Sequence, residues 1–354
     1  MSVIADLTAD AACATALPRL VRLNEHVTAV AFDVMKVLPA HYMIERAVAE
    51  GLITEGTVVV ETTSGTFGLG LAMVCALRGI PLHLVSDPAI EGALYDRIVD
   101  LGARITVVRE PAAVGGYQAA RLDALERIRA GYPSTYVPSQ YGNVNNPRAY
   151  AAVAAQIVEH VRSPAWIVGP VGSGGSMCGT VRAVREVIPE VKAVGVDTHN
   201  SRLFGQQDGP RLLRGLGNSL LPPNLDHTVF DEVHWITAEL AFAATRALHR
   251  RHALYMGPTS GAAHLVAEHV ARRANGGGGQ VVVLLPDHGH RYADTVYNDA
   301  WLRAELGRPP ISAEASGTEP EWRRVPPRHG TGWQALDWSR RSLADVLASA
   351  AAAR

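Results

Sequence analysis

The sequence predicts an α/β fold in which two doubly wound parallel sheets form separate domains. Short runs of β-branched and apolar residues alternate with longer helical patterns along most of the chain, which is typical of parallel sheets covered by helices. The alternation comes in two blocks, which meet near residue 147. A chain of 354 residues is long enough for about two domains. We therefore expect two α/β domains with a cleft between them.

The first block opens with a predicted hairpin and continues as alternating strands and helices. Asn24-Glu25-His26 separates the strand-like runs 19–23 and 27–32, a spacing typical of a hairpin. The helical pattern at 39–51 ends at Gly51, since glycine is a common residue just after a helix. Further strands are predicted at 57–60, 82–86, 105–108 and 135–138. One further helix follows the first of these strands and its loop and ends at Leu77, and two more are predicted at 90–101 and 116–130.

The second block repeats the alternation and ends in a region of different composition. Strands are predicted at 165–168, 193–197, 232–236 and 281–285. Helices are predicted at 147–160, 176–188 and 260–274, and another follows the 232–236 strand and ends at His252. The stretch 198–224 is irregular, and the glycines at 276–279 indicate a flexible turn. Proline, glycine and charged residues from 308 to about 332 predict an ill-ordered tail segment, followed by a terminal helix at 335–352.

Composition excludes several classes of protein. The net charge is −1 and the pI is about 6.9, which argues against a nucleic-acid or anionic-membrane partner held by charge. Apolar runs fall short of the roughly 20 residues that span a bilayer, and the acidic, Ala-rich N-terminus is unlike a secretory signal. The three cysteines have neither metal-ligand nor disulfide spacing. We expect a reducing, cytoplasmic location and no metal.

Lysine is rare in this chain. Lys36 and Lys192 are its only lysines, whereas arginine supplies every other basic residue in a Lys+Arg total of 33. Lys192 follows a turn, where a solvated ammonium is expected. Lys36 lies between apolar residues, and an amine there can lose its proton and bond a carbonyl, as guanidinium cannot. The alternative is a surface lysine whose stem lies along apolar neighbours.

Two strand-to-helix loops carry candidate ligand groups. Gly172-Ser173-Gly174-Gly175-Ser176 combines three glycines with two hydroxyls, so its amides and the following helix could hold one phosphate. A tight turn that needs glycine for packing is the alternative. Thr62-Thr63-Ser64-Gly65-Thr66 is rich in hydroxyls and could hold a carboxylate, although a helix N-cap explains one or two of them equally well.

Several motifs occur in an order typical of one enzyme family. They are Lys36 with Met43-Ile44, Glu50 to Leu52, Glu61 to Gly68, Gln140 to Asn143 with Asn146-Pro147, the 172–176 loop, Gly215 to Gly217, Gly257 to Gly261, and Leu285 to Tyr292. In this order they resemble the cysteine synthase and cystathionine β-synthase family, the tryptophan-synthase-like (fold type II) enzymes that use pyridoxal 5′-phosphate. The resemblance covers about residues 15–305.

One branch of that family is the most similar. Its motifs are Pro111 to Tyr117, Val196-Asp197, Leu203 to Gly205, and Asp294 to Asp299 with Trp301. This branch, N-(2-amino-2-carboxyethyl)-L-glutamate synthase, joins O-phosphoserine to glutamate on the way to diaminopropionate. The resemblance implies a smaller substrate domain at 37–146, a larger cofactor domain of 1–36 with 147–305, and a tail at 306–354. It also implies a homodimer with small-molecule amino-acid substrates and the cofactor in the interdomain cleft.

The resemblance also assigns roles to residues. It makes Lys36 the catalytic Schiff-base lysine. The remaining cofactor-binding residues would be Thr66, Gly172, Ser173, Gly174, Gly175, Ser176 and Thr259, with Thr259 facing the pyridine nitrogen. The substrate would be held by Thr63, Ser64, Gly65, Thr66, Gln140 and Gly215.

Two departures from the family pattern are visible. Thr66 stands where the family usually has asparagine. The approach to Lys36 is about five residues shorter than usual and brings in Asp33 and Met35 directly. An unpaired buried carboxylate is costly, so Asp33 is either solvated at the cleft mouth or faces the incoming nucleophile. In the second case we expect an acceptor other than glutamate.

The resemblance implies β-replacement on a β-substituted alanine such as O-phosphoserine or O-acetylserine. The substrate would lose its β-substituent to give an aminoacrylate intermediate, which an amine or thiol then attacks. Two alternatives stay open. One is β-elimination without an acceptor, as in a cysteine desulfhydrase. The other is a catalytically silent homologue that acts as a binding subunit.

Overall fold

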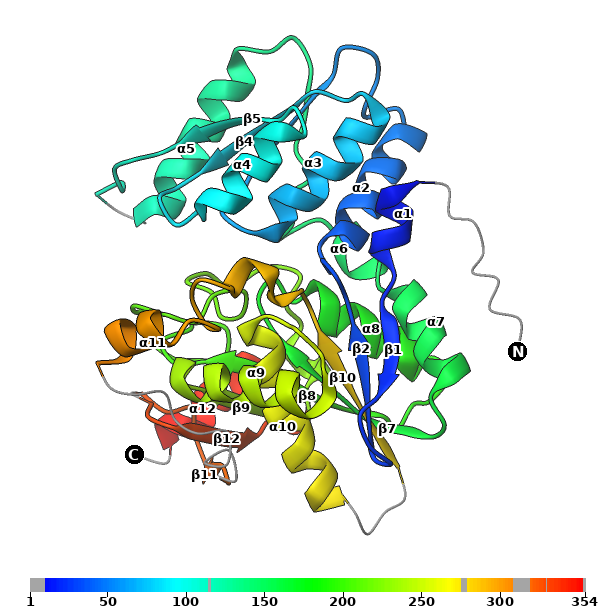
Figure 1. The fold of residues 1–354 in the computed structure, drawn as a ribbon, viewed down its shortest axis with the longest axis vertical. Helices are drawn as coiled ribbons and strands as arrows, with labels where there is room; N and C mark the ends of the chain where they lie inside the picture. Colours follow the sequence, from blue (N-terminus) through cyan, green and yellow to red (C-terminus); the bar gives the residue numbers. More distant parts are fainter. Residues whose placement is uncertain (1–9, 114–115, 275–278, 308–318, 329, 353–354) are drawn as a thin grey trace. The chain divides into compact units, whose positions relative to one another are not determined.

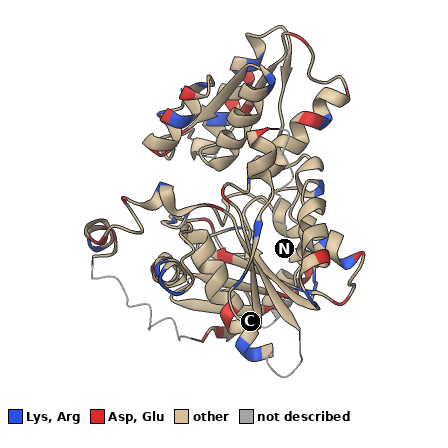
Figure 2. Ribbon diagram, turned by 45° about the vertical axis from the view of Figure 1, so that its right-hand side comes forward, with Lys and Arg blue, Asp and Glu red and all other residues tan. Residues whose placement is uncertain are grey.

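The computed structural model describes residues 10–113, 116–274, 279–307, 319–328 and 330–352. The chain forms two compact units (Figure 1). The first unit consists of Met1–Leu17 and Val34–Ala149, and the second of Pro18–Asp33 and Tyr150–Arg354. Figure 2 shows acidic and basic residues interspersed over the helices and loops of both units, in keeping with the net charge of −1.

The first unit contains a four-stranded parallel sheet with strand order β5-β4-β3-β6. Its strands are β3 (Val58–Thr62), β4 (Leu82–Ser86), β5 (Arg104–Val107) and β6 (Thr135–Tyr136). The helices are α1 (Ala11–Ala16), α2 (Val37–Ala49), α3 (Thr66–Arg78), α4 (Gly92–Asp100), α5 (Gly116–Ala130) and α6 (Asn145–Arg148). Buried Val58 and Val60 of β3 pack with Ala124 and Leu125 of α5.

The N-terminal helix belongs to the first unit because α1 packs on α2 and α3. The sequence-based boundaries put residues 1–36 with the larger domain, and the structure divides them differently. Only 18–33, which form the hairpin strands, belong to the second unit. Lys36 lies in the first unit, where Val37 N–H donates to Val34 O at 3.0 Å.

The second unit contains an eight-stranded sheet with strand order β1-β2-β10-β7-β8-β9-β12-β11. Its strands are β1 (Arg19–Arg22), β2 (Val27–Ala31), β7 (Pro164–Pro170), β8 (Lys192–Thr198), β9 (Glu232–Ile236), β10 (Gln280–Leu285), β11 (Glu321–Arg323) and β12 (Trp333–Asp337). The central strands are parallel, as predicted. The predicted hairpin is confirmed: β1 pairs antiparallel with β2, and Asn24 Oδ1 accepts from the N–H groups of His26 and Val27.

Helices cover the second sheet. They are α7 (Ala151–His160), α8 (Gly175–Arg185), α9 (Ala238–His252), α10 (Pro258–Ala274), α11 (Asp299–Leu306) and α12 (Leu343–Ala352). Short 3₁₀ helices occur at η1 (His227–Val229) and η2 (Gly289–Tyr292). The helices α9 and α10 form the most extensive helix pair and contribute Ala244, Leu248 and Val266 to the main core. In the described part of the chain, none of the helices has both the length and the apolar character that a membrane span requires.

The C-terminal region differs from the sequence prediction. Residues 333–337 form β12, which pairs antiparallel with β9, so the predicted helix over 335–352 is wrong in its first part and begins at Leu343. Fully buried Trp338 packs against Phe204 with ring centroids 5.2 Å apart. Tertiary pairing therefore overrides the local pattern. Residues 275–278 of the predicted turn, and 308–318 and 329 of the predicted tail segment, lie outside the described residues.

Candidate active site

Lys36 stands at the start of α2, in the first unit. It is the N-cap residue of that helix, and its carbonyl accepts from Ala40 N–H at 3.2 Å. Its side chain is partly buried, and burial lowers the pKa of the amine from 10.5 to about 8. Lys192 differs: it is exposed at the start of β8, with its ammonium 4.8 Å from the centroid of the Trp166 ring. The amine of Lys36 is therefore the one suited to nucleophilic chemistry.

A close helix contact fixes the backbone of Lys36. A Cβ at Gly70 of α3 would lie 2.7 Å from the Lys36 carbonyl oxygen and 3.1 Å from the Val37 Cα. No real side chain tolerates such distances, so α3 can pack on α2 here only through glycine. The sequence reasoning missed Gly70. The available signal was a glycine inside an otherwise helical apolar pattern.

The 62–66 loop connects β3 to α3 in the first unit. Thr63 is buried, and its hydroxyl accepts from Gly65 N–H at 3.2 Å. The N-cap residue of α3 is Gly65, which provides no side-chain cap. The first N–H groups of a helix come before its i→i−4 hydrogen bonds begin, and of these the N–H of Gly68 donates to Gly65 O at 3.0 Å. Together with the partly exposed Ser64 and Thr66, they form a set of donors suited to a carboxylate.

Glu61 joins this loop to Gln140. Its buried carboxylate accepts from Thr62 N–H at 2.8 Å and from Gln140 N–H at 3.3 Å. Burial raises the pKa of the Glu61 carboxyl to about 7. Asn146 adds a hydrogen bond from its side-chain amide to the Gln140 carbonyl at 2.5 Å. The structure thus brings together two predicted substrate-binding segments through residues that had no predicted role.

A buried cation also adjoins the 62–66 loop. Arg121 of α5 forms an ion pair with Asp87 at 3.3 Å and donates to Ser64 Oγ at 3.5 Å. Both charged side chains are buried. The sequence reasoning missed Arg121, since nothing in the pattern of α5 distinguishes it from a surface arginine.

The 172–176 loop connects β7 to α8 in the second unit. Gly174 is the N-cap residue, adopts φ = 83° and provides no side-chain cap, while the N–H of Gly175 donates to Ser173 Oγ at 3.4 Å. Buried Ser173 and Ser176 add hydroxyl groups. The packing explanation for glycine also holds in part, because a Cβ at Gly174 would lie 2.6 Å from the Leu225 Cα. The loop is therefore both tightly packed and suited to an anion.

Three segments that the sequence predicted separately converge on this loop. Gly217 N–H donates to Val171 O at 2.9 Å, and the Asn218 side-chain amide donates to Gly172 O at 3.4 Å. A Cβ at Gly215 would lie 2.8 Å from Cγ2 of the buried Thr259. The 172–176 loop, Gly215 and Thr259 therefore form one continuous surface within the second unit. We call it the loop cradle.

Asp33 is paired and half-exposed. Its carboxylate lies 3.0 Å from the Arg19 guanidinium and 3.1 Å from His288 Nε2, and 53% of its side chain is exposed. This agrees with the solvated alternative for Asp33. Met35, in contrast, is buried.

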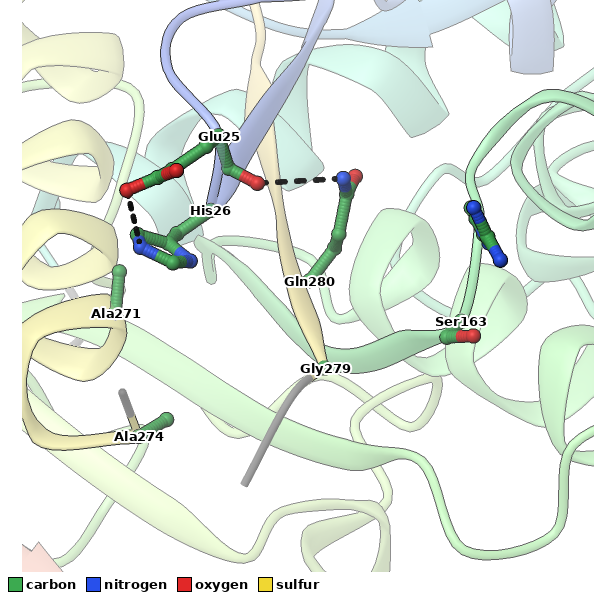
Figure 3. A pocket seen from close by; sticks show the side chains of 8 residues that line it. Glu25, His26, Ser163, Ala271, Ala274, Gly279 and Gln280 are labelled. Carbon is green, nitrogen blue, oxygen red and sulfur yellow. Dashed lines mark hydrogen bonds and ion pairs between the residues drawn. The ribbon is translucent and has the colours of Figure 1, made fainter. Parts of the chain in front are cut away.

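A pocket elsewhere in the second unit contains none of the predicted site residues (Figure 3). It has a volume of about 460 Å³ and is lined by Glu25, His26, Arg162, Ser163, Ala271, Ala274, Gly279 and Gln280. These residues lie near the starts of β2, β7 and β10 and at the C-terminal end of α10. Ligands of open parallel sheets bind outside the carboxyl ends of the strands, where the 172–176 loop follows β7. This pocket is therefore not the candidate active site.

The predicted site residues form two groups, one in each unit. Lys36, the 62–66 loop and Gln140 belong to the first unit, and the loop cradle belongs to the second. A partly buried amine of lowered pKa and a glycine-rich helix N-terminus with flanking hydroxyls define a class: an α/β enzyme that can use a phosphate-bearing carbonyl cofactor. The chain belongs to the pyridoxal-phosphate dependent enzyme family, whose family model matches residues 31–287. It is a pyridoxal-phosphate dependent enzyme.

Several solved enzyme structures are similar to this chain. A hydrogen sulfide-producing enzyme from Fusobacterium nucleatum is 27% identical with a TM-score of 0.75, over 81% of this chain and 100% of that one. An O-acetylserine dependent cystathionine β-synthase from Helicobacter pylori is 27% identical with a TM-score of 0.70, over 79% and 90%. O-acetylserine sulfhydrylase isoform 3 from Entamoeba histolytica shares the fold at 23% identity, with a TM-score of 0.75 over 84% and 94%. The predicted fold class is confirmed.

The loop cradle fits the cofactor. Pyridoxal phosphate carries a phosphate dianion, and the first turn of α8, with the hydroxyls of Ser173 and Ser176, offers several donors to it. The hydroxyl of buried Thr259 is uncharged, as a partner for an unprotonated ring nitrogen must be.

Proposed function

We propose that this protein catalyses β-replacement on a β-substituted alanine of the O-phosphoserine or O-acetylserine type, and joins it to an amine or a thiol. The observation that carries the proposal is the loop cradle, in which Gly215 and Thr259 meet the 172–176 loop. The name of one relative at 27% identity supports it, since that cystathionine β-synthase depends on O-acetylserine.

Each group has a role in this proposal. When bound, the cofactor supplies an electron sink for the substrate. Lys36 holds the cofactor covalently and, once its amine is released, takes the proton from the substrate α-carbon. The 62–66 loop and Gln140 bind the substrate carboxylate, and Glu61 holds both segments in place. The amides and hydroxyls at 172–176 bind the cofactor phosphate, Thr259 faces the ring nitrogen, and Gly215 faces the substrate amino group.

The acceptor belongs to this proposal too. The motifs at 111–117 and 294–301 favour the branch that uses glutamate, although residues 114–115 lie outside the described part of the chain. A bare Asp33 would disfavour an anionic acceptor. The adjacent positive charge of Arg19 offsets the negative charge of Asp33, and the exposure of both side chains to solvent weakens what remains, because exposed charges interact by only about 0–1 kcal/mol. Glutamate is therefore a candidate acceptor, together with other amines and thiols.

Elimination without an acceptor is the second candidate. It is favoured by the name of the Fusobacterium nucleatum relative, a hydrogen sulfide-producing enzyme. In that reaction the substrate would yield pyruvate and ammonia instead of a new amino acid.

Product analysis separates the two candidates. The purified holoenzyme is incubated with O-phosphoserine or O-acetylserine, with and without glutamate, a neutral amine or sulfide. We expect a new amino acid by mass spectrometry only when an acceptor is present, together with release of phosphate or acetate. Pyruvate formed at the same rate with and without acceptors would contradict β-replacement. No turnover of any β-substituted alanine, with cofactor bound, would contradict both reactions.

A further inference from the structure

Three side chains with metal-binding atoms meet where α9 and α10 pack together. His252 is the last residue of α9, and His264 and Glu268 are one helical turn apart on α10. One ligand atom from each residue lies within 4.8 Å of the other two. None of the three belongs to the candidate active site.

The central member of this cluster, which we call the His252 cluster, is a buried imidazole. His264 is 3% exposed, and among the described residues its Nε2 has no partner at ordinary hydrogen-bond geometry, although it lies in a 3.5 Å ion pair with Glu268. Buried polar atoms are nearly always satisfied, and an unsatisfied one costs stability. His252 and Glu268 are only partly buried, so an ion from solvent can reach the cluster.

The spacing fits two ligands of one ion better than it fits a hydrogen bond. His264 Nε2 lies 3.5 Å from Glu268 Oε1. Two atoms bound at about 2.0–2.2 Å to a tetrahedral zinc ion are separated by roughly 3.3–3.5 Å. The His252 ring lies beside that of His264, with centroids 5.6 Å apart. Glu268 also accepts from the Asn24 side-chain amide at 3.2 Å, which orients its carboxylate.

We propose that His252, His264 and Glu268 bind a divalent transition-metal ion, with Zn²⁺ the natural occupant and water in the remaining position. Imidazole nitrogen suits zinc, whereas Mg²⁺ and Ca²⁺ prefer sites made of oxygen atoms. Neutral imidazoles and one carboxylate leave the occupied site with a charge of +1. The ion would link the end of α9 to α10 across the connecting segment at 253–257.

A second cluster offers a contrast in the first unit. Ligand atoms of Asp10, Cys13 and His41 also lie within 4.8 Å of one another. There, Asp10 Oδ1 accepts from Cys13 N–H and Cys13 Sγ lies 3.4 Å from His41 Nε2, so these groups satisfy each other. Burial also raises the pKa of the Cys13 thiol, which disfavours the thiolate that zinc requires. This cluster serves as the internal control.

The test measures metal binding to the holoenzyme. The protein is stripped with a chelator, and Zn²⁺ alone is added in an isothermal titration, with Mg²⁺ and Ca²⁺ in parallel. We expect one equivalent of Zn²⁺, no competition from Mg²⁺ or Ca²⁺, and a Tm rise of about 2 °C or more at saturation. Co²⁺ provides a second readout, because nitrogen ligands give it a visible absorption band.

Matched variants decide where the ion binds. His252→Gln and His264→Gln should each weaken zinc binding by at least about 10-fold, since even groups that only support a ligand contribute this much. His249→Gln, which alters an exposed histidine on the same helix, and His41→Gln should bind as the wild type does. Circular dichroism checks folding, and the partly exposed His252 keeps the test valid if His264→Gln unfolds. Loss of zinc in His41→Gln, or full binding by His252→Gln, would overturn the proposal.

Discussion

A Cβ at Gly70 would lie 2.7 Å from the carbonyl oxygen of Lys36. The lysine proposed to bond the cofactor is therefore held by a helix that has no side chain at the point of contact. Any residue larger than glycine at position 70 must displace α3 or the start of α2. This contact connects a packing detail to the position of the reactive amine.

We expect Gly70→Ala to reduce turnover by more than 10-fold and to lower Tm, because overpacking a core typically costs about 1–3 kcal/mol. Steady-state kinetics and thermal unfolding measure the two effects. Gly92→Ala is the matched control: it lies at the start of α4 in the same unit, and a Cβ there meets no atom within 4 Å. Normal activity in Gly70→Ala would show that the contact does not position Lys36.

Lys36→Ala should abolish both the absorbance of the lysine-bound cofactor and all turnover, because only an amine can form that bond. Lys192→Ala should leave both unchanged, since Lys192 is exposed and its ammonium lies over the face of Trp166, away from the predicted site residues. Absorbance spectra and activity assays on the two variants provide the comparison. Turnover by Lys36→Ala at the wild-type rate would refute the assignment.

The pKa of Lys36 leads to a pH prediction for the cofactor-free protein. With a pKa of about 8 instead of 10.5, roughly one amine in ten is neutral at pH 7, compared with roughly one in three thousand for an ordinary lysine. Only the neutral amine attacks the cofactor aldehyde. The rate of cofactor capture, followed by absorbance, should rise about 10-fold per pH unit below pH 8 and level off above it. A rise that continues towards pH 10 would contradict the lowered pKa.

The lowered pKa of Lys36 also makes the folding stability of the cofactor-free protein depend on pH, and the direction of this dependence can be predicted. The unfolded chain holds the Lys36 proton up to about pH 10.5, whereas the folded, cofactor-free protein releases it near pH 8. Because the unfolded state binds more protons in this range, this residue makes folding more favourable as pH rises from 8 to 10.5. Denaturant unfolding of the cofactor-free wild type and Lys36→Met at pH 7.5 and pH 9.5 isolates the contribution. An equal response of the two proteins would contradict it.

The phosphate loop is best tested at Ser176. Gly174 is unsuitable, because its φ of 83° and its contact with Leu225 make any substitution there disrupt packing. Ser176→Asp places a negative charge at the N-terminus of α8, where it repels a phosphate. We expect cofactor affinity to fall by more than 10-fold, and circular dichroism of the cofactor-free protein checks that the variant is folded. Ser176→Ala is the control for loss of the hydroxyl alone. Undiminished cofactor affinity in Ser176→Asp would contradict the role of the loop.

Local patterns predicted the parts of this protein that depend on local order. The 165–168 run is β-branched and apolar, and Gly172 to Ser176 follows it, so both the strand and the anion-binding turn could be recognised. The resemblance then gave the cofactor, which the family match confirms. Boundaries shifted by a few residues, as for the helix predicted at 39–51 and observed at Val37–Ala49.

The residues that sequence reasoning missed act through contacts distant in the chain. Gly70 is important because it packs against the backbone of Lys36. Glu61 is important because its carboxylate accepts a hydrogen bond from the N–H of Gln140. Arg121 resembles any surface arginine until Asp87 and Ser64 are found beside it. The β12 strand was read as helix because its pairing partner, β9, lies about a hundred residues earlier.

The pairing of β12 with β9 has a practical consequence for truncated forms of this protein. The family match ends at residue 287, and a chain shortened to that point would lack β12. The fully buried strand β9 would then present an open edge to solvent. Open apolar edges recruit strands from other molecules. The shortened enzyme should precipitate during expression, so β12 protects the edge of β9 against aggregation.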